Sequence, residues 1–242
     1  EGENLQPATF QLSNRVGAVV TEMMPGILEE KTHALYIMGE DPIMSDPNTH
    51  HIRECLEAID FLVLQEIFPS ETSAYADVLL PGVTFAEKTG TFTNTERRVQ
   101  MVRKAIPTQG DARDDWWITS EIAKRMIELR IHAERSEFRI DSDAPWAKWD
   151  YKDTSEIMSE INALTPSYGG ITHARLEKGE RLQWPCPTAE HPGTPILHVG
   201  KFTRGKALLS ALAYRAPAEE PDAEYPFRLT TGRLLQHFHT GS

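Results

Sequence analysis

Three short apolar runs constrain the fold of this chain more than any other feature. They lie at residues 34–38, 61–64 and 77–82, and segments compatible with helices separate them. A fully apolar run of this length is typical of a strand that is buried on both faces, as in a parallel sheet. Right-handed crossovers through the intervening helices would join such strands. The sequence therefore predicts an α/β fold: a doubly wound, mostly parallel sheet with flanking helices.

Helical periodicity appears between these runs and after them. The longest helical pattern has two acidic residues, Asp114 and Asp115, in its first turn, where they complement the helix dipole. A later pattern has a capping residue at Asp153 or Thr154 and is stopped before Pro166. The predicted helices cover residues 16–30 with a break near Pro25-Gly26, residues 50–59, a short segment with Ser70 as N-cap, residues 114–130 and residues 154–164.

Proline and glycine become frequent after residue 164, and helical periodicity weakens. We expect long, ordered loops there, with short strands at 196–202 and 207–214 and a new strand from residue 224. Both ends of the sequence look cut, so we expect a piece of a longer polypeptide. The predicted organisation is an α/β dinucleotide-type cofactor-binding domain over 1–164, a loop-rich connecting segment over 165–221 and the start of a further domain over 222–242.

Charge and composition exclude several classes of protein. The formal net charge is −11, which opposes a role in binding nucleic acid. We find no apolar run long enough to span a bilayer and recognise no signal peptide, so a cytoplasmic location is the default expectation. Two cysteines, Cys55 and Cys186, form neither a disulfide framework nor a CxxC metal motif. Cys55 lies in an apolar helical pattern and is interpreted as a small buried hydrophobic residue.

Polar residues follow the first two predicted strands. Glu40 and Asp41 come after the first strand, and Gln65 and Glu66 end the second. In an open parallel sheet these positions share one edge, where ligands bind. Carboxylates there could accept hydrogen bonds from ribose hydroxyls or guanine N–H groups, and Gly39 would let a ligand approach the backbone. A GxGxxG motif does not follow either strand. The alternative is that the two acidic residues only cap the next turn.

The stretch GTFTNTERRVQ, at residues 90–100, is dense in hydrogen-bonding groups and follows the third strand. Arg97 and Arg98 could bind a carboxylate or phosphate through bidentate guanidinium contacts, and Thr93, Asn94 and Gln100 add neutral polar groups. The alternative is a solvated polar loop with an ion pair to the acidic residue of the stretch. The residues alone leave both interpretations open.

The last thirteen residues, TTGRLLQHFHTGS, contain a second group of polar side chains. His237 and His239 alternate as on one face of a strand, but a metal site needs three or four ligands, and no third ligand is near. We therefore predict no metal site and interpret these residues as polar contacts to a cofactor.

Six stretches together resemble the molybdopterin oxidoreductase family, and within it the catalytic alpha subunits of formate dehydrogenases. They run in the order YIMGEDPIMSDPNTHHIRECL, LVLQEIFPSETSAYADVLLPGVTFAEKTGTFTNTERRVQMVRKA, GDARDDWWITSEIAKRM, LQWPCP, GTPILHVGKFTRG and EYPFRLTTGRLLQHFHTG. The resemblance implies a bis(molybdopterin guanine dinucleotide) cofactor with Mo or W, and formate as substrate. It also implies that the last segment opens a truncated C-terminal cofactor-binding β-barrel.

The resemblance also implies roles for individual residues. Arg97 matches the family's active-site arginine, which orients the substrate, and Gln100 is its expected partner. The positions implied to contact the cofactor are Gly39, Glu40, Asp41, Pro42, Gln65, Glu66, Ile67, Thr72, Asp77, Thr231, Gly232, Arg233, His237, His239, Thr240 and Gly241.

The chain also departs from the family pattern. The metal-ligating Cys or selenocysteine and the cysteines of a 4Fe-4S cluster are expected upstream of this sequence, and neither Cys55 nor Cys186 stands in those motifs. The partners implied are the rest of the catalytic subunit and iron–sulfur electron-transfer subunits. Two alternatives stay open: a nitrate reductase of the same family, and a noncatalytic nucleotide-binding or structural module.

Overall fold

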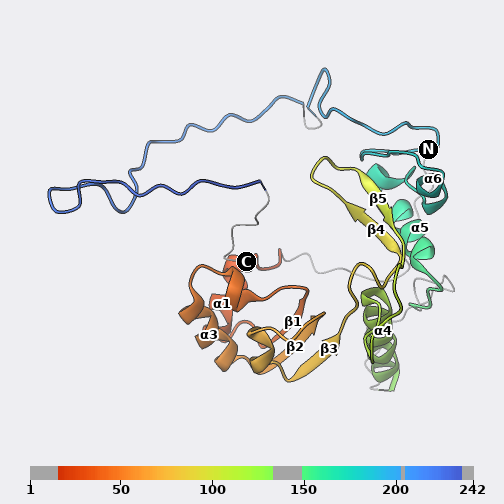
Figure 1. The fold of residues 1–242 in the computed structure, drawn as a ribbon, viewed down its shortest axis with the longest axis horizontal. Helices are drawn as coiled ribbons and strands as arrows, with labels where there is room; N and C mark the ends of the chain where they lie inside the picture. Colours follow the sequence, from red (N-terminus) through yellow and green to blue (C-terminus); the bar gives the residue numbers. More distant parts are fainter. Residues whose placement is uncertain (1–15, 133–148, 203–204, 236–242) are drawn as a thin grey trace. The chain divides into compact units, whose positions relative to one another are not determined.

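The computed structural model describes residues 16–132, 149–202 and 205–235. The chain divides into two units, Glu1–Pro195 and Ile196–Ser242, and each is described by itself. All the helices and strands of the described residues belong to the first unit (Figure 1).

A parallel sheet forms from the three apolar runs, as predicted. Its strands are β1 (Ala34–Met38), β2 (Phe61–Glu66) and β3 (Val78–Pro81), and both neighbouring pairs are parallel. Their spatial order, β1-β2-β3, follows the chain. A doubly wound sheet contains a reversal of strand order, and the described strands do not include one. The structure therefore confirms the coarser part of the prediction, which is a parallel sheet with flanking helices.

The helices of this half pack their apolar residues against the sheet. They are α1 (Val20–Leu28), α2 (Pro42–Ser45), α3 (Thr49–Ala58) and the 3₁₀ helix η1 (Thr72–Tyr75). The core that they share with β2 contains Met24, Ile27, Ile43, Ile52, Cys55, Leu56 and Leu62, so Cys55 is a buried hydrophobic residue as predicted.

Two local predictions about these helices are wrong. The break near Pro25-Gly26 does not occur: Pro25 lies inside α1, and its carbonyl accepts the N–H of Glu29 at the end of the helix. A proline removes one N–H donor, and the later turn forms without it. Ser70 does not cap η1 with its side chain; instead its carbonyl accepts both the backbone N–H and the hydroxyl of Ser73.

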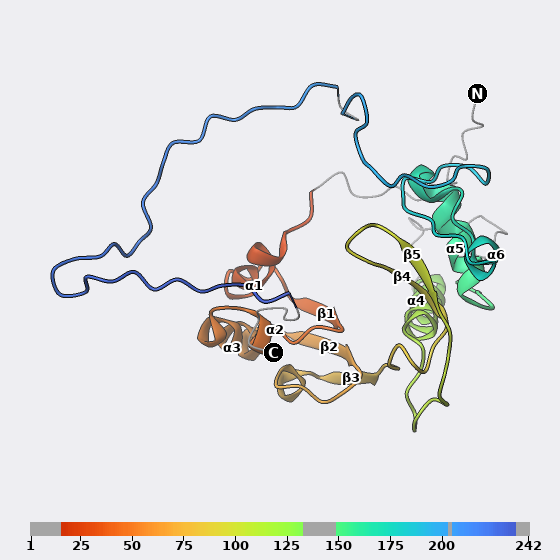
Figure 2. The same ribbon diagram turned by 45° about the horizontal axis from the view of Figure 1, so that its top comes forward.

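An antiparallel hairpin, absent from the sequence-based prediction, follows the sheet. Its strands β4 (Gly90–Thr93) and β5 (Val99–Val102) form a separate two-stranded sheet, visible as a long ribbon in Figure 2. Asn94 organises the turn between them because its Oδ1 accepts the N–H groups of Glu96 and Arg98, at 3.1 and 2.9 Å. The polar stretch 90–100 is therefore a hairpin and its turn.

The second half of the first unit is helical and loop-rich. It contains α4 (Asp115–His132), α5 (Thr154–Leu164), the 3₁₀ helix η3 (Pro166–Tyr168) and α6 (His173–Glu177). The α5 prediction is confirmed to the residue, and Asp153 caps it by accepting the N–H groups of Ser155 and Glu156. A second core joins this region to β5 through Val99, Ile171, Leu176, Leu182 and Cys186.

The second unit does not contain the predicted strands. The described residues of 196–202, 207–214 and 224–233 are irregular or in turns, apart from an isolated bridge between Phe202 and Gly205. Leu208 and Phe227 are 92% and 90% exposed. A strand needs a neighbouring strand for its backbone hydrogen bonds, and the described residues of this unit do not provide one. The expected barrel is therefore not observed.

None of the described helices combines the length and the apolar character needed to cross a membrane.

Candidate functional site

The carboxyl ends of β1 and β2 meet at one edge of the sheet, as predicted. Gly39 follows β1, and its N–H donates to the carbonyl of Gln65 over 2.9 Å. Gly39 has a φ of +64°, which side chains rarely adopt, and no atom lies within 4 Å of the position that a Cβ would take. This edge therefore offers an open stretch of backbone beside Gln65 and Glu66.

Gln65 is buried and takes part in a hydrogen-bond network. Its Oε1 accepts the hydroxyl of Tyr36, and its Nε2 donates to Oδ1 of Asp115 over 2.7 Å. The other oxygen of Asp115 pairs with Lys88. Burial, with the Asp115 carboxylate as the smaller cause, raises the pKa of Tyr36. Because Gln65 is only 1% exposed, it braces the edge of the sheet from within.

Asp41 and Thr72 brace the loop beyond β1. Asp41 Oδ1 accepts the hydroxyl of Thr72 over 2.5 Å and its N–H over 3.3 Å. Thr72 is fully buried, and its hydroxyl also accepts the N–H of Ile43 over 3.4 Å. Glu40 accepts the hydroxyl of Ser45. For Asp41, these bonds favour the alternative given by the sequence analysis, in which the acidic residue caps the turn after β1. Glu40, in contrast, is exposed at the edge of the sheet.

The other positions predicted along this sheet fall into two places. Pro42 opens α2, and Ile67 follows Glu66, whose Oε1 accepts its N–H over 2.6 Å, so these three lie at the carboxyl edge. Asp77 does not: its carboxylate accepts the N–H of Leu62, at the start of β2, over 2.7 Å. Asp77 thus lies at the amino edge of the strands, and the structure does not bring it together with Gly39.

Arg97 lies at the end of the hairpin turn, with a φ of +68°. Its Nη1 donates to the carbonyls of Trp184 and Thr194, the latter over 3.0 Å, and its Nη2 donates to the carbonyl of Pro195 over 3.0 Å. The guanidinium carbon lies 5.7 Å from the centroid of the Trp184 ring. The side chain expected to face a substrate is therefore directed toward a loop of the protein itself.

Arg98 and Gln100 line a cavity of about 330 Å³ on β5. Arg98 pairs through Nη2 with Glu96 over 2.9 Å, while its Nε is buried and has no hydrogen-bond partner among the described residues. A buried N–H without a partner is unfavourable, because the group has lost its hydrogen bonds to water. The lining residues are Arg98, Val99, Gln100, Met101, Arg103, Leu176, Gly179, Glu180 and Arg181.

The electrostatics of this cavity favour an anion. Its lining residues include three arginines, Arg98, Arg103 and Arg181, and one acidic residue, Glu180. That carboxylate is neutralised by Arg175, whose Nη2 lies 2.6 Å from it, and this bond lowers the pKa of Glu180. From the residues alone, the sequence analysis grouped Arg98 with Arg97, and only the family resemblance singled out Arg97. Alternation along a strand, which places Arg98 and Gln100 on the same face, was the signal that could have linked Arg98 to this cavity.

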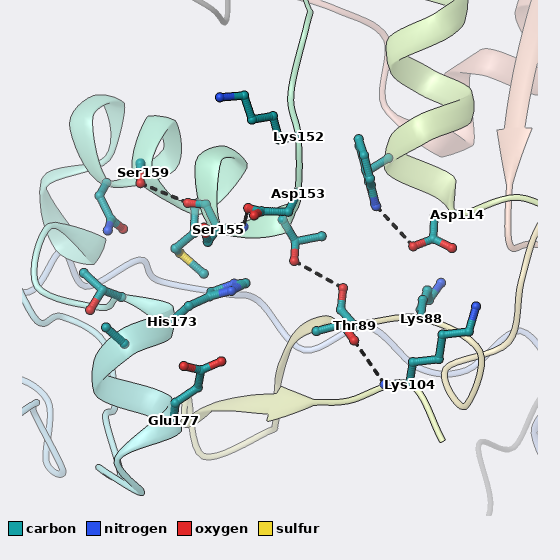
Figure 3. Close-up of a pocket in the computed structure, with 16 residues that line it drawn as sticks. Lys88, Thr89, Lys104, Asp114, Lys152, Asp153, Ser155, Ser159, His173 and Glu177 are labelled. Carbon is teal, nitrogen blue, oxygen red and sulfur yellow. Dashed lines mark hydrogen bonds between the residues drawn. The ribbon is translucent and has the colours of Figure 1, made fainter. Parts of the chain in front are cut away.

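A second cavity, of about 600 Å³, lies at the base of the hairpin and was not predicted. Figure 3 shows Lys88, Lys104 and Asp114 on one side of it and His173 and Glu177 on the other. Hydrogen bonds from Ser155 and Glu156 lower the pKa of Asp153, which also lines it, and burial lowers the pKa of His173. Charges of both signs line this cavity, so its ligand preference is not defined by charge.

The predicted C-terminal contacts are only partly described. Thr231, Gly232 and Arg233 are in an irregular segment of the second unit, and His237, His239, Thr240 and Gly241 lie outside the described residues. Among residues 16–132, 149–202 and 205–235, no group of three or more His, Cys, Asp or Glu side chains could hold a metal ion.

Comparisons with known proteins place these features in context. Residues 3–125 match the family described as molybdopterin oxidoreductase. The chain is 45% identical, over 86% of its length, to the F420-dependent formate dehydrogenase subunit alpha of Methanocaldococcus jannaschii, and covers 28% of that protein. It is 39% identical, over 97% of its length, to the subunit alpha of F420-dependent formate dehydrogenase 2 of Methanococcus maripaludis, and covers 32% of it.

Among solved structures, the acetylene hydratase of Pelobacter acetylenicus matches with a TM-score of 0.47 and 21% identity, over 65% of this chain and 20% of that one. The chain therefore spans less than a third of the length of each of these relatives.

Proposed function

This chain belongs to the molybdopterin oxidoreductase family, and from this we propose that it is part of the catalytic alpha subunit of a formate dehydrogenase. The observation that carries the proposal is 45% identity, over most of the chain, to a protein named as such a subunit. The proposed reaction converts formate to carbon dioxide with release of one proton and two electrons. The proposed partners are the rest of the subunit and iron–sulfur electron-transfer subunits.

The proposed cofactor is bis(molybdopterin guanine dinucleotide) with Mo or W, and a 4Fe-4S cluster would be held by another part of the subunit. The carboxyl edge of the sheet fits a guanine nucleotide. Gly39 leaves the backbone open, and Glu40 and Glu66 supply carboxylate acceptors for guanine N–H groups and ribose hydroxyls. Gln65, Asp41 and Thr72 support this edge. When bound, the cofactor supplies the two-electron redox chemistry, and the protein supplies binding and orientation.

We place the three-stranded sheet within the doubly wound sheet of the whole subunit. The support for this is chemical: strands of a parallel sheet are normally covered on both faces, yet Tyr36, Phe61 and Leu79 are exposed here. In the same way, the exposed apolar side chains after residue 196 suit a C-terminal barrel completed by further polypeptide. Thr231, Gly232, Arg233, His237, His239, Thr240 and Gly241 remain proposed cofactor contacts there.

For the substrate, the proposed contact is Arg97, with Gln100 as its partner. Formate is a small carboxylate, and a guanidinium group binds a carboxylate through two parallel hydrogen bonds. Arg97 donates to the carbonyls of Trp184, Thr194 and Pro195, which leaves two of its five N–H donors for a carboxylate. In the whole subunit Arg97 would hold the carboxylate and orient its C–H bond.

The test uses the intact subunit and formate-dependent reduction of a viologen dye. We expect Arg97→Gln to lower kcat/KM by about 10²–10³-fold, corresponding to the loss of one preorganised charged donor. The matched control is Arg113→Gln, because Arg113 is exposed and its side chain, among the described residues, donates only to the neighbouring carbonyl of Ala112. Unchanged turnover in Arg97→Gln would exclude this substrate site. Reduction of nitrate in place of formate oxidation would exclude the proposed reaction.

A further inference from the structure

The cavity beside β5 opens where a short ladder of backbone hydrogen bonds ends. Val99 donates its N–H to the carbonyl of Leu182 over 2.9 Å, and Arg98 and Gln183 form an antiparallel bridge. If this pairing continued, residues 179–181 would lie along the rest of β5. Beyond Val99, however, no backbone hydrogen bond joins these described residues to β5. The two segments therefore separate, and residues of both line the cavity of about 330 Å³.

The edge of β5 along this cavity contributes a backbone donor. Val99 directs its N–H away from β4, because it donates to Leu182. Alternate residues of an antiparallel strand direct their N–H groups to the same side, so the N–H of Met101 also points away from β4. Met101 lines the cavity. The volume of about 330 Å³ is at the lower end of the range for small-molecule sites, roughly 300–1,000 Å³, and therefore suits a small ligand.

The residues that line the cavity, together with their ion-pair partners, carry an excess of positive charge. Four arginines there face only two carboxylates. Arg98 and Arg175 each pair with one carboxylate, at N–O distances of 2.9 and 2.6 Å. Arg103 and Arg181 are exposed, and neither forms an ion pair with another described residue. Four positive and two negative groups leave a formal charge of +2, on a chain whose net charge is −11.

This excess charge and the type of donor both match a phosphate group. A phosphate monoester carries a charge of roughly −1.5 to −2 at pH 7 and has three strong acceptor oxygens. Guanidinium groups match the geometry of phosphate oxygens and bind them through paired hydrogen bonds. A monoanionic carboxylate would neutralise only half of the excess charge. The chemistry of the cavity therefore favours a tetrahedral dianion.

We propose that this cavity binds a phosphate group, which belongs either to inorganic phosphate or to a phosphomonoester. The oxyanion accepts hydrogen bonds from Arg103, Arg181 and the Nε–H of Arg98, which is buried and has no partner among the described residues. Bound there, the ligand joins β5 to residues 179–181 at the point where their backbone pairing has ended. The proposal does not depend on the proposed function, and it assigns no part of formate binding to this cavity.

The alternative is that the unpaired arginines are only solvated. The experiment is titration calorimetry of the intact subunit with inorganic phosphate, in chloride buffers of constant ionic strength, so that general screening of charge does not change. We expect saturable binding at one site. Arg103→Gln and Arg181→Gln should each weaken it at least tenfold, because hydrogen bonds to charged groups are among the strongest in proteins. Arg113→Gln, an exposed arginine outside the lining, is the matched control.

The two substitutions should not disturb folding, because Arg103 and Arg181 are exposed and have no ion pair among the described residues. The Tm of each variant in chloride alone checks this point. In phosphate, the Tm of the unsubstituted subunit should rise, since a ligand that binds only the folded state stabilises it. The Tm of the double variant Arg103→Gln/Arg181→Gln should not rise.

Titration with phenyl phosphate distinguishes the two sources of the ligand. Equal affinities would show that the cavity recognises the phosphate group alone, and tighter binding of the ester would identify an organic phosphate as the occupant. Absence of saturable binding of either probe would overturn the proposal, as would equal affinities in the double variant and in Arg113→Gln.

A competition measurement separates this site from the proposed substrate site. Formate at the same concentration as phosphate should not displace it. Displacement would show that the cavity is part of the substrate site and would overturn the inference. In contrast, normal formate oxidation by Arg97→Gln would exclude the proposed substrate contact and leave the phosphate result unaffected.

Discussion

Gln65 and Asp115 are 50 positions apart in the sequence, and a hydrogen bond of 2.7 Å joins Nε2 of the first to Oδ1 of the second. Through this bond the end of β2 is tied to the first turn of α4. Lys88, just before β4, pairs with the other oxygen of the same carboxylate. One acidic residue thus connects the parallel sheet, the long helix and the base of the hairpin.

Removal of the Asp115 carboxylate should destabilise the protein. Asp115→Ala leaves the buried amide of Gln65 without its acceptor, and loss of a buried partner costs about 1–3 kcal/mol. Urea unfolding followed by circular dichroism measures this change. Asp111→Ala is the control, since Asp111 is exposed. Equal stability of the two variants would show that the bond contributes nothing.

Residues 169 and 170 should tolerate no side chain larger than hydrogen. A Cβ on Gly170 would lie 1.9 Å from the carbonyl oxygen of Thr188, so Gly170→Ala must displace the segment after Cys186. We expect a loss of about 1–3 kcal/mol or more, as for other overpacked sites, and a lower Tm. Gly17→Ala, where no atom lies within 4 Å, should leave Tm within about one degree. A Gly170→Ala protein as stable as the control would contradict this close packing.

Glu87 should make stability depend on acid pH. Hydrogen bonds from Thr84, and a further one from the N–H of Gln109, lower the pKa of Glu87 in the folded protein. A carboxylate with a lowered folded pKa stabilises the fold above the pKa of the unfolded chain, roughly 4.3 for Glu. That contribution is lost as the pH falls through the lower, folded pKa. Unfolding measured between pH 3 and pH 7 should therefore show a shallower dependence in Glu87→Gln; an unchanged slope would refute this role.

The edge of the sheet should bind guanine nucleotides weakly even in the 242-residue chain. Titration calorimetry with GMP tests this, because the guanine N–H groups and ribose hydroxyls would meet Glu40 and Glu66. Glu40→Ala combined with Glu66→Ala should abolish the heat of binding, whereas Glu57→Ala, on the exposed face of α3, should not. Equal binding by all three proteins would place the nucleotide elsewhere. We expect this chain alone not to oxidise formate.

Local sequence patterns were sufficient to predict much of the fold. The three apolar runs became β1, β2 and β3, and α5 begins and ends where its cap and Pro166 predict. The hairpin was missed because GTFTNTERRVQ has polar residues on both faces, so its alternation is weak. Residues 196–202 and 207–214 have the composition of strands, but strand formation depends on a partner that composition does not specify.

Some features of the candidate site could be predicted from the sequence, and others could not. That Gly39, Gln65 and Glu66 share an edge follows from the parallel arrangement of consecutive strands and could be predicted. The sequence could not predict that Gln65 joins an internal hydrogen-bond network or that Asp77 lies at the opposite edge of the sheet. Both features depend on contacts that form only in the folded protein.

The sequence by itself determined the parallel strands, the main helices, the edge at which they end and the family. Only the tertiary structure decided which groups two adjacent arginines lie against. Arg97 and Arg98 have the same chemistry and neighbouring positions, but Arg97 meets carbonyls 87 to 98 residues further along the chain, while Arg98 faces a cavity. Contacts over such separations arise from the packing of whole elements, and no local pattern encodes them.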